Sequence, residues 1–313
     1  MDIRPEPASL YPPSVNFHLW EPCNMRCRFC FATFQDVKQT LLPKGHLPRA
    51  QAMDVVGKLC AAGFQKITFA GGEPTLCPWL GDLLVCAKEH GLTTMLVTNG
   101  SRLLAPGFLQ KLSAALDWVV LSLDSADPRT HERLGRSIAG RVGRALPVAH
   151  YQEVATALRA HNIRLKINTV VSAQNADEDL TELLLALRPE RWKALQVLAM
   201  DGQNDGRVEP LLIDEQTFSR FVARHRRLAE FGVWLIAEDN EAMTGSYAMV
   251  DPAGRFFSNT ASTYRYSRPI LDVGVKAAWQ DIRFDPERFD KRGGHYDWGE
   301  PLVQELVPVS RLR

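Results

Sequence analysis

The chain has 313 residues, which is long for one compact domain but within the range of a single α/β barrel with extensions. Its 37 Lys and Arg residues nearly balance its 36 Asp and Glu residues, so its net charge indicates neither a nucleic-acid coat nor a polybasic membrane surface. The sequence contains neither the roughly 18 to 20 consecutive apolar residues of a membrane span nor an N-terminal signal peptide. We therefore expect one cytoplasmic catalytic unit without membrane or direct nucleic-acid binding.

Apolar runs of period two alternate with longer segments of helical period along the first two thirds of the chain, which is typical of βα units around a parallel sheet. We predict strands at residues 15–20, 66–72, 94–100, 118–125, 165–171 and 191–199. We predict helices at residues 48–62, 79–90, 106–115, 147–161 and 177–187, the last with Asp177, Glu178 and Asp179 in its first turn. Six strands are too few for a closed eight-stranded barrel, so the predicted fold is α/β, a partial (βα)6 barrel.

The pattern divides the chain into three parts. Residues 1–13 form a short N-terminal lead, residues 14–200 the partial barrel, and residues 201–313 a C-terminal extension. The extension contains a predicted amphipathic helix at 214–231, a short run at 233–240 and an irregular tail. We expect it to cap the substrate cavity, with the active site on the loops after the strands.

Three of the six cysteines lie in CNMRCRFC, residues 23–30, directly after the first predicted strand. In a reducing cytosol such a cluster indicates a metal or redox site and not disulfides. Zinc sites usually show a second cysteine pair or a histidine pair, and this sequence has none. A 4Fe-4S cluster held by Cys23, Cys27 and Cys30 would leave one iron open for another ligand. We expect Cys60 and Cys86, which lie in helical patterns, to be small core residues.

The C-x3-C-x2-C spacing after a strand, with Phe29 between the last two cysteines, resembles the signature of the radical S-adenosylmethionine (SAM) superfamily. The second predicted strand ends in GGEP, residues 71–74, and its glycines permit a close approach of the backbone to a ligand. The resemblance implies that this motif contacts the methionine amino group of SAM. It also assigns three residues at later strand ends, Asn99, Ser122 and Asp124, to SAM, although turn formation and helix capping explain them equally well.

Alternation along the predicted strands places polar side chains on the inner face, where a ligand would bind. These side chains are Asn16, His18, Lys66, Thr68, Lys166, Asn168, Arg191 and Lys193. Two cations 4 Å apart repel by about 4 kcal/mol at an effective dielectric of 20, so the four cations in this set require an anion such as a triphosphate. The alternative is that they lie at the lower rim of the barrel and extend into water.

Several longer segments, among them SVNFHLWEPCNMRCRFCF, KITFAGGEPTL, ILDVGVKAA and FDKRGGHYDW, are similar to the viperin family of radical SAM enzymes. The family removes the ribose 3′-hydroxyl of a nucleoside triphosphate to give a chain-terminating, antiviral 3′-deoxy-3′,4′-didehydro nucleotide. The resemblance implies a 4Fe-4S cluster, a flavodoxin or ferredoxin as electron donor, and SAM bound by Gly71, Gly72, Glu73, Ser122 and Asn168. It also implies a substrate site formed by Asn16, Lys66, Thr68, Lys166, Arg191, Lys193, Asn240 and Arg292. It implies that Tyr247 relays a hydrogen atom or proton, although a purely structural role for a half-buried tyrosine is equally consistent with the sequence.

The resemblance leaves the base undetermined among CTP, UTP and GTP. Animal members carry a membrane-anchoring N-terminal helix, whereas about a dozen Pro-rich residues precede the first predicted strand here. Another radical SAM reaction on a phosphorylated substrate is an alternative, although members with auxiliary clusters need further cysteines and none follows Cys86. A nucleotide-binding module without catalysis is the second alternative, and it would produce no 5′-deoxyadenosine.

Overall fold

Ten strands form one sheet in the computed structural model, which describes residues 10–139 and 145–298. The strand order is β10-β9-β8-β1-β2-β3-β4-β5-β6-β7. The strands are β1 (Ser14–Trp20), β2 (Lys66–Gly71), β3 (Thr93–Thr98), β4 (Trp118–Ser122), β5 (Arg164–Val171), β6 (Arg191–Gln196), β7 (Trp234–Glu238), β8 (Met249–Val250), β9 (Arg255–Ser258) and β10 (Arg265–Pro269). The six predicted strands correspond to β1 to β6.

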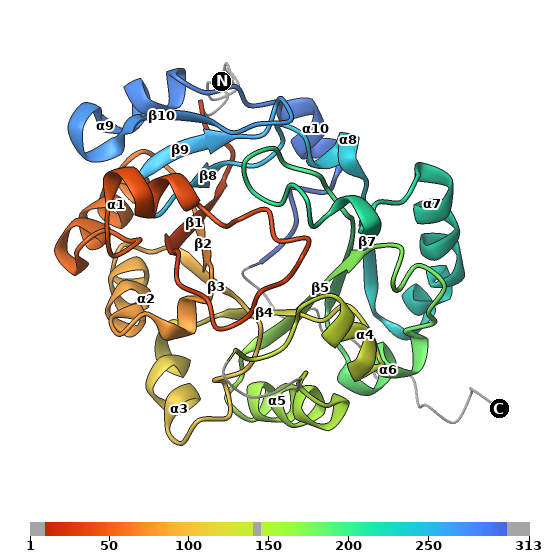
Figure 1. The fold of residues 1–313 in the computed structure, drawn as a ribbon. Coiled ribbons are helices and arrows are strands. Elements are labelled where there is room, and N and C mark those ends of the chain that lie inside the picture. Colours follow the sequence, from red (N-terminus) through yellow and green to blue (C-terminus); the bar gives the residue numbers. More distant parts are fainter. Residues whose placement is uncertain (1–9, 140–144, 299–313) are drawn as a thin grey trace, which may run out of the picture.

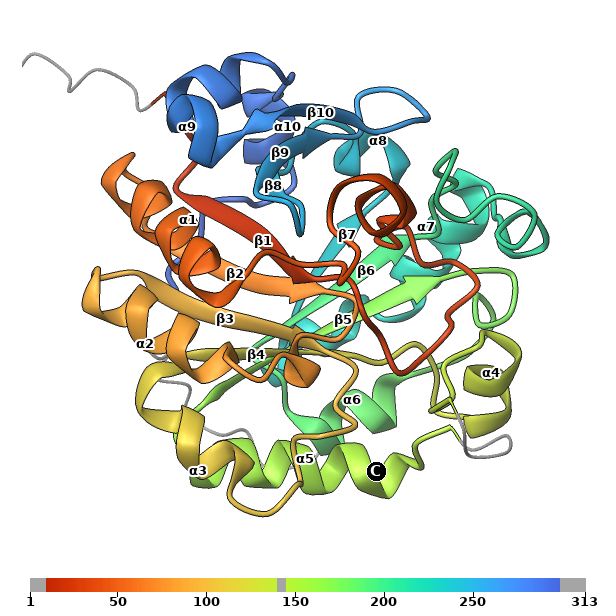
Figure 2. The same cartoon turned by 60° about the vertical axis from the view of Figure 1, so that its left-hand side comes forward.

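The sheet curves into an open barrel, as Figures 1 and 2 show. Strands β1 to β8 pair in parallel, whereas β9 and β10 are antiparallel. Because β7 and β8 end the parallel part without pairing, the barrel has an open side, which confirms the predicted partial barrel. Residues after 200 add β7 at one edge and β8 to β10 at the other. The three-part division stays a prediction, and residues 1–9 and 299–313 lie outside the described residues.

Helices surround the sheet (Figure 1). They are α1 (Arg49–Ala61), α2 (Leu80–Glu89), α3 (Phe108–Leu112), α4 (Pro128–Arg133), α5 (Val148–Ala160), α6 (Thr181–Leu187), α7 (Glu215–Arg224), α8 (Asn240–Met243), α9 (Ile270–Gln280) and α10 (Pro286–Lys291). Short 3-10 turns lie at Pro74–Leu76, Ser113–Ala115, Glu209–Leu211 and Arg226–Phe231, and a π-helical turn at Val37–Leu41. No helix in the described ranges is long and apolar enough to cross a bilayer.

The main apolar core lies between the outer face of the sheet and the helices. Its strand members include the predicted outward residues Val15, Phe17, Ile67, Phe69, Ile167 and Trp192. Helices α1, α2 and α5 contribute Leu59, Leu83 and Leu158, which are all fully buried. The predicted assignment of strand faces is therefore confirmed, and it leaves the polar strand residues on the inner face.

Two predicted helices differ from the structure. Helix α6 begins at Thr181, so the acidic residues 177–179 precede its first turn, where Asp179 accepts a hydrogen bond from the Thr181 N–H at 2.9 Å. The predicted helix at 214–231 is α7 followed by a 3-10 turn, with buried His225 at the junction accepting from the Leu180 N–H at 2.9 Å. Of the two cysteines expected in the core, Cys86 is buried, but Cys60 is half-buried.

Candidate active site

The cysteine loop follows β1 and crosses the mouth of the barrel at the C-terminal ends of the strands (Figures 1 and 2). Cys23, Cys27 and Cys30 are half-buried free thiols. Burial is the main cause that raises the pKa of Cys23 to about 11 and that of Cys27 to about 12. Since a metal deprotonates a coordinating thiol outright, these neighbouring thiols suit a metal centre.

The three thiols lie close enough together to affect one another, since the charge of Cys30 raises the pKa of Cys23 and of Cys27. Iron–sulfur clusters are held by cysteine thiolates. Hydrogen bonds to sulfur tune such clusters, and the Met25 N–H donates one to Cys23 Sγ at 3.4 Å. The three cysteines therefore fit a 4Fe-4S cluster.

The glycines of the GGEP turn allow this turn to pack directly on the chain that enters the cysteine loop. A Cβ on Gly71, whose φ is +145°, would lie 2.3 Å from the Trp20 carbonyl oxygen. A Cβ on Gly72 would lie 2.1 Å from the Glu21 carbonyl oxygen. Real Cβ atoms do not approach so closely, and only glycine permits this contact.

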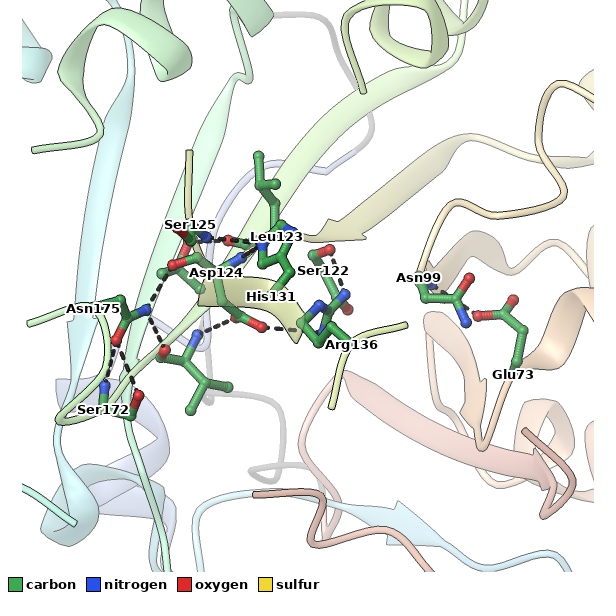
Figure 3. Close-up of polar contacts among 12 residues, drawn as sticks. Glu73, Asn99, Ser122, Leu123, Asp124, Ser125, His131, Arg136, Ser172 and Asn175 are labelled. Carbon is green, nitrogen blue, oxygen red and sulfur yellow. Dashed lines mark hydrogen bonds and ion pairs between the residues drawn. The ribbon is translucent and has the colours of Figure 1, made fainter. Parts of the chain in front are cut away.

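The Glu73 carboxylate joins the ends of β2 and β3 to the cysteine loop. One oxygen accepts a hydrogen bond from the Thr98 hydroxyl at 2.7 Å. The other accepts from the Asn99 N–H at 2.8 Å (Figure 3). The Asn99 amide in turn donates to Asn24 Oδ1 in the loop at 2.8 Å. Burial raises the pKa of Glu73. Glu73 and Asn99 thus shape the predicted SAM site, and their contacts with SAM stay a prediction.

Arg136 is a buried cation at this site that the sequence analysis missed. Its Nη1 lies 3.1 Å from Asp124 Oδ2, and its Nη2 donates to the Ser122 carbonyl at 2.6 Å (Figure 3). Its Nε is buried without a hydrogen-bond partner. An unpartnered guanidinium N–H suits a carboxylate ligand, such as that of the SAM methionine moiety. Asp124 is placed to hold Arg136 in this position.

Backbone pairing places Arg136 beside the cysteine loop. The Arg26 N–H donates to the Gly135 carbonyl at 3.2 Å, and the Arg28 N–H donates to Leu134 at 2.9 Å. The charge of Arg136 lowers the otherwise raised pKa of Cys27, which shows their proximity. Arg136 lies outside every strand, so no alternation in the sequence marks it.

The predicted strand cations do meet inside the barrel. Lys66, Lys166, Arg191 and Lys193 are each at most 7% exposed, so the alternative in which they reach water at the rim is wrong. Lys166 and Arg191 are register partners on β5 and β6. Burial, followed by the charges of neighbouring cations, lowers the pKa of Lys66 to about 7. The same causes lower the pKa of Lys166 well below its usual range. An anion in the lumen would relieve this cost.

The C-terminal segment crosses the lumen at the starts of the strands, opposite the cysteine loop. The Tyr296 hydroxyl accepts from Lys66 Nζ at 3.0 Å, and the Arg191 guanidinium lies 3.7 Å from the centre of the Tyr296 ring. The Trp298 carbonyl accepts from Trp118 Nε1 at 3.0 Å. The sequence indicated only an irregular tail here, because these contacts depend on the folded barrel.

A second polar group lies beside the cations. Tyr247 and Lys193 both donate hydrogen bonds to the carboxylate of Glu238, which is fully buried. Arg292 Nη1 lies 3.4 Å from the same carboxylate, and its guanidinium lies 3.7 Å from the centre of the Tyr247 ring. The structure thus brings the predicted residues Tyr247, Lys193 and Arg292 together around Glu238, which the sequence analysis did not identify.

The remaining predicted residues line the site or support it. Asn16 and Thr68 are register partners on β1 and β2. Asn168 and Asn240 each have a buried side-chain oxygen without a hydrogen-bond partner in the protein, so each oxygen could accept a hydrogen bond from a ligand. The Phe29 side chain packs in an apolar cluster with Leu134, Val197, Val208 and Leu211. Their ligand contacts stay predictions.

Comparison with known proteins adds to this geometry. The model of the radical SAM superfamily matches residues 20–187. Solved structures with this fold include Streptococcus suis SuiB bound to S-adenosylmethionine, with a TM-score of 0.61 and 16% identity, covering 79% of this chain and 60% of that one. Native anSMEcpe with bound AdoMet and a Kp18Cys peptide has a TM-score of 0.65 and 15% identity, covering 89% and 82%. At such identities these likenesses show the fold alone.

Three curated relatives carry the name S-adenosylmethionine-dependent nucleotide dehydratase. The Flammeovirga pacifica protein is 49% identical over 91% of this chain and 96% of its own length. The Lacinutrix mariniflava protein is 47% identical over 94% of this chain, which spans 60% of that relative. The Danio rerio protein, named RSAD2, is 34% identical over 92% of this chain and 79% of its own length. The chain therefore belongs to the radical SAM superfamily and, within it, to the viperin-like family of S-adenosylmethionine-dependent nucleotide dehydratases.

Proposed function

We propose that this protein converts a ribonucleoside triphosphate, CTP, UTP or GTP, to its 3′-deoxy-3′,4′-didehydro analogue. The buried cations of the lumen carry this proposal. Lys66, Lys166 and Arg191 form no salt bridge among the described residues, because the nearby buried carboxylate of Glu238 pairs with Lys193 and Arg292. A triphosphate would supply the missing negative charge. The names of the relatives support the reaction class.

The cofactors of the radical SAM family, a 4Fe-4S cluster and SAM, would lie at the opposite end of the lumen. Cys23, Cys27 and Cys30 would hold the cluster, and Arg136 would bind the SAM carboxylate. When bound, they supply a 5′-deoxyadenosyl radical that takes the 4′ hydrogen of the ribose. The chain orients the substrate, because cations at the strand starts hold the triphosphate while the ribose extends toward the cysteine loop.

Loss of the 3′-hydroxyl as water then requires one proton and one further electron. We assign the proton to the Tyr247 hydroxyl, which donates to Glu238 in the nucleotide-free structure and would turn to the leaving hydroxyl once the ribose is bound. The Lys193 ammonium, which donates to the Tyr247 oxygen at 3.2 Å, would then return a proton to the phenolate. The electron would come from a flavodoxin or ferredoxin in the cytosol. Since the product lacks the hydroxyl to which the next nucleotide is joined, it would terminate RNA chains, in keeping with an antiviral role.

The test is an anaerobic reaction of the iron-reconstituted protein with dithionite, SAM and each ribonucleoside triphosphate in turn. Mass spectrometry is expected to find 5′-deoxyadenosine together with one nucleotide lighter by one water, which identifies the base. If 5′-deoxyadenosine forms and no nucleotide changes, the substrate proposal is wrong while the cofactor assignment holds. If a triphosphate binds without any 5′-deoxyadenosine, the protein is a binding module.

A further inference from the structure

The open side of the barrel is closed by side chains and not by a strand pair. Strands β7 and β8 end the parallel part of the sheet and are not hydrogen-bonded to each other. Glu238 is the last residue of β7, and Tyr247 lies two residues before β8. The Tyr247 hydroxyl donates to Glu238 Oε2 across this gap. One carboxylate–phenol contact therefore joins the two edges.

Glu238 is also the anion to which the two neighbouring cations, Lys193 and Arg292, are bound. Its Oε1 accepts from the Lys193 ammonium and lies 3.4 Å from Arg292 Nη1. Burial alone would raise the pKa of Glu238, but Lys193 and Arg292 lower it to about 2, so the side chain is an anion at neutral pH. Burial and the neighbouring Glu238 charge raise the pKa of Tyr247, which keeps the phenol protonated as a donor.

The hydrogen bonds and cation contacts of Tyr247 all involve this carboxylate or a cation that it binds, whereas its ring also packs against the apolar cluster of Met249 and Phe257. Its hydroxyl donates to Glu238, and its oxygen accepts from Lys193, which Glu238 also holds. The Arg292 guanidinium, held by Glu238 and by the Ser246 carbonyl at 2.8 Å, lies over its ring. Removal of the carboxylate would leave the Tyr247 hydroxyl without its acceptor and leave two cations facing the ring.

We propose that Glu238 is a positioning residue that fixes the Tyr247 hydroxyl relative to the nucleotide ribose. The inference rests on the proposed function, in which Tyr247 supplies the proton to the leaving hydroxyl. Glu238 itself does not contact the reacting atoms. Its loss therefore lowers the fraction of radical-forming events that lead to dehydrated nucleotide. It does not weaken the binding of triphosphate, because removal of the carboxylate increases the positive charge around the phosphates.

Two substitutions of Glu238 distinguish the position of its carboxylate from the charge that it carries. Glu238→Gln keeps the length of the side chain but removes its charge, whereas Glu238→Asp keeps the charge but shortens the reach by one methylene group. A role in charge balance alone predicts that Glu238→Asp behaves like the wild type. A positioning role predicts that both variants lose coupling, which is the amount of dehydrated nucleotide formed per 5′-deoxyadenosine. Glu241→Gln, at an 82% exposed side chain on α8, is the matched control.

The experiment measures three quantities on the reconstituted full-length chain: dehydrated nucleotide formed per 5′-deoxyadenosine, triphosphate affinity by calorimetry without reductant, and the melting temperature. We expect both Glu238 variants to lose at least about tenfold in the product ratio, since small misplacements at reacting centres cost up to about 10²-fold. Triphosphate affinity is expected to stay the same in Glu238→Asp and to stay the same or increase in Glu238→Gln. Glu241→Gln is expected to match the wild type.

A double-variant cycle keeps the test decisive if Glu238 also affects folding. Tyr247→Phe removes only the hydroxyl, and the Tyr247→Phe/Glu238→Gln double variant is expected to be no less coupled than Tyr247→Phe alone. Additive losses, or wild-type coupling in Glu238→Asp, would overturn the positioning role while leaving the proposed function intact. If the wild type dehydrates no triphosphate, the proposed function and this inference fail together.

Discussion

Arg136 is expected to serve both the stability of the fold and the binding of SAM. Its Nη1 pairs with Asp124 at 3.1 Å, and its buried Nε is left without a partner. We predict that Arg136→Gln weakens SAM binding by about tenfold or more, because a charge-assisted hydrogen bond contributes roughly 1.5 to 3 kcal/mol. Equilibrium binding of SAM to the cluster-loaded protein, without reductant, measures this change. Arg129→Gln, at an exposed site on α4, is the control.

The same substitution strands the Asp124 charge in a buried site, which by itself destabilises a protein by about 3 to 5 kcal/mol. The double variant Arg136→Gln/Asp124→Asn removes that unpaired charge. We expect it to recover most of the free energy of unfolding but none of the SAM affinity. Recovery of both would show that Arg136 acts only through folding.

At the level of elements, Gly135 joins the segment after α4 to the cysteine loop. Its φ is +76°, and a Cβ would lie 2.3 Å from the Arg26 carbonyl oxygen. We predict that Gly135→Ala separates the two segments and lowers the iron content per chain after reconstitution. The free energy of unfolding is expected to fall by more than about 1 kcal/mol, as for alanine at a positive φ that also clashes.

Gly107→Ala provides the control for Gly135. Gly107 has a similar φ of +70° but nothing within 4 Å of its Cβ position. It therefore carries the backbone cost without the clash. We expect this variant to lose a little stability and to bind iron normally. Equal iron loss in both variants would show that backbone strain, and not contact with the cysteine loop, determines cluster loading.

Elements with many residues were predictable from the sequence, and short ones were not. Strands β1, β2, β5 and β6 show enough alternation to reveal both faces, which is why Lys166 and Arg191 were placed in the lumen correctly. Strand β8 has only two residues and β9 four, too few for any period. Helix α9 is interrupted at Gly274, whose φ is +79°. Ser122, which accepts from Arg136, lies 14 residues away in the chain, and Tyr247 and Lys193, which donate to Glu238, lie 9 and 45 residues away. These separations exceed the period of a helix or strand, so no local pattern identifies Arg136 or Glu238.

At the scale of the whole molecule, the overall charge is balanced while the lumen is strongly cationic. Burial and neighbouring cations lower the pKa of Lys66 to about 7 and that of Lys193 to about 8. Above pH 7 the folded, nucleotide-free protein therefore binds fewer protons at these lysines than the unfolded chain does. Stability rises with pH wherever the unfolded state binds more protons. We predict that the free energy of unfolding increases between pH 7 and pH 8, by on the order of 1 kcal/mol.

Burial without nucleotide favours the neutral form of these lysines, whereas a bound triphosphate would favour their charged form. Nucleotide affinity is therefore expected to weaken over the same pH range, with proton uptake that calorimetry detects as a dependence on the ionisation enthalpy of the buffer. Lys66→Met should reduce both the pH dependence of unfolding and the proton uptake, whereas Lys44→Met, at an exposed site, should change neither. If stability is flat between pH 7 and pH 8 and binding takes up no protons, the lumen lysines are already fully charged without nucleotide. Their charge would then be balanced by something other than the substrate.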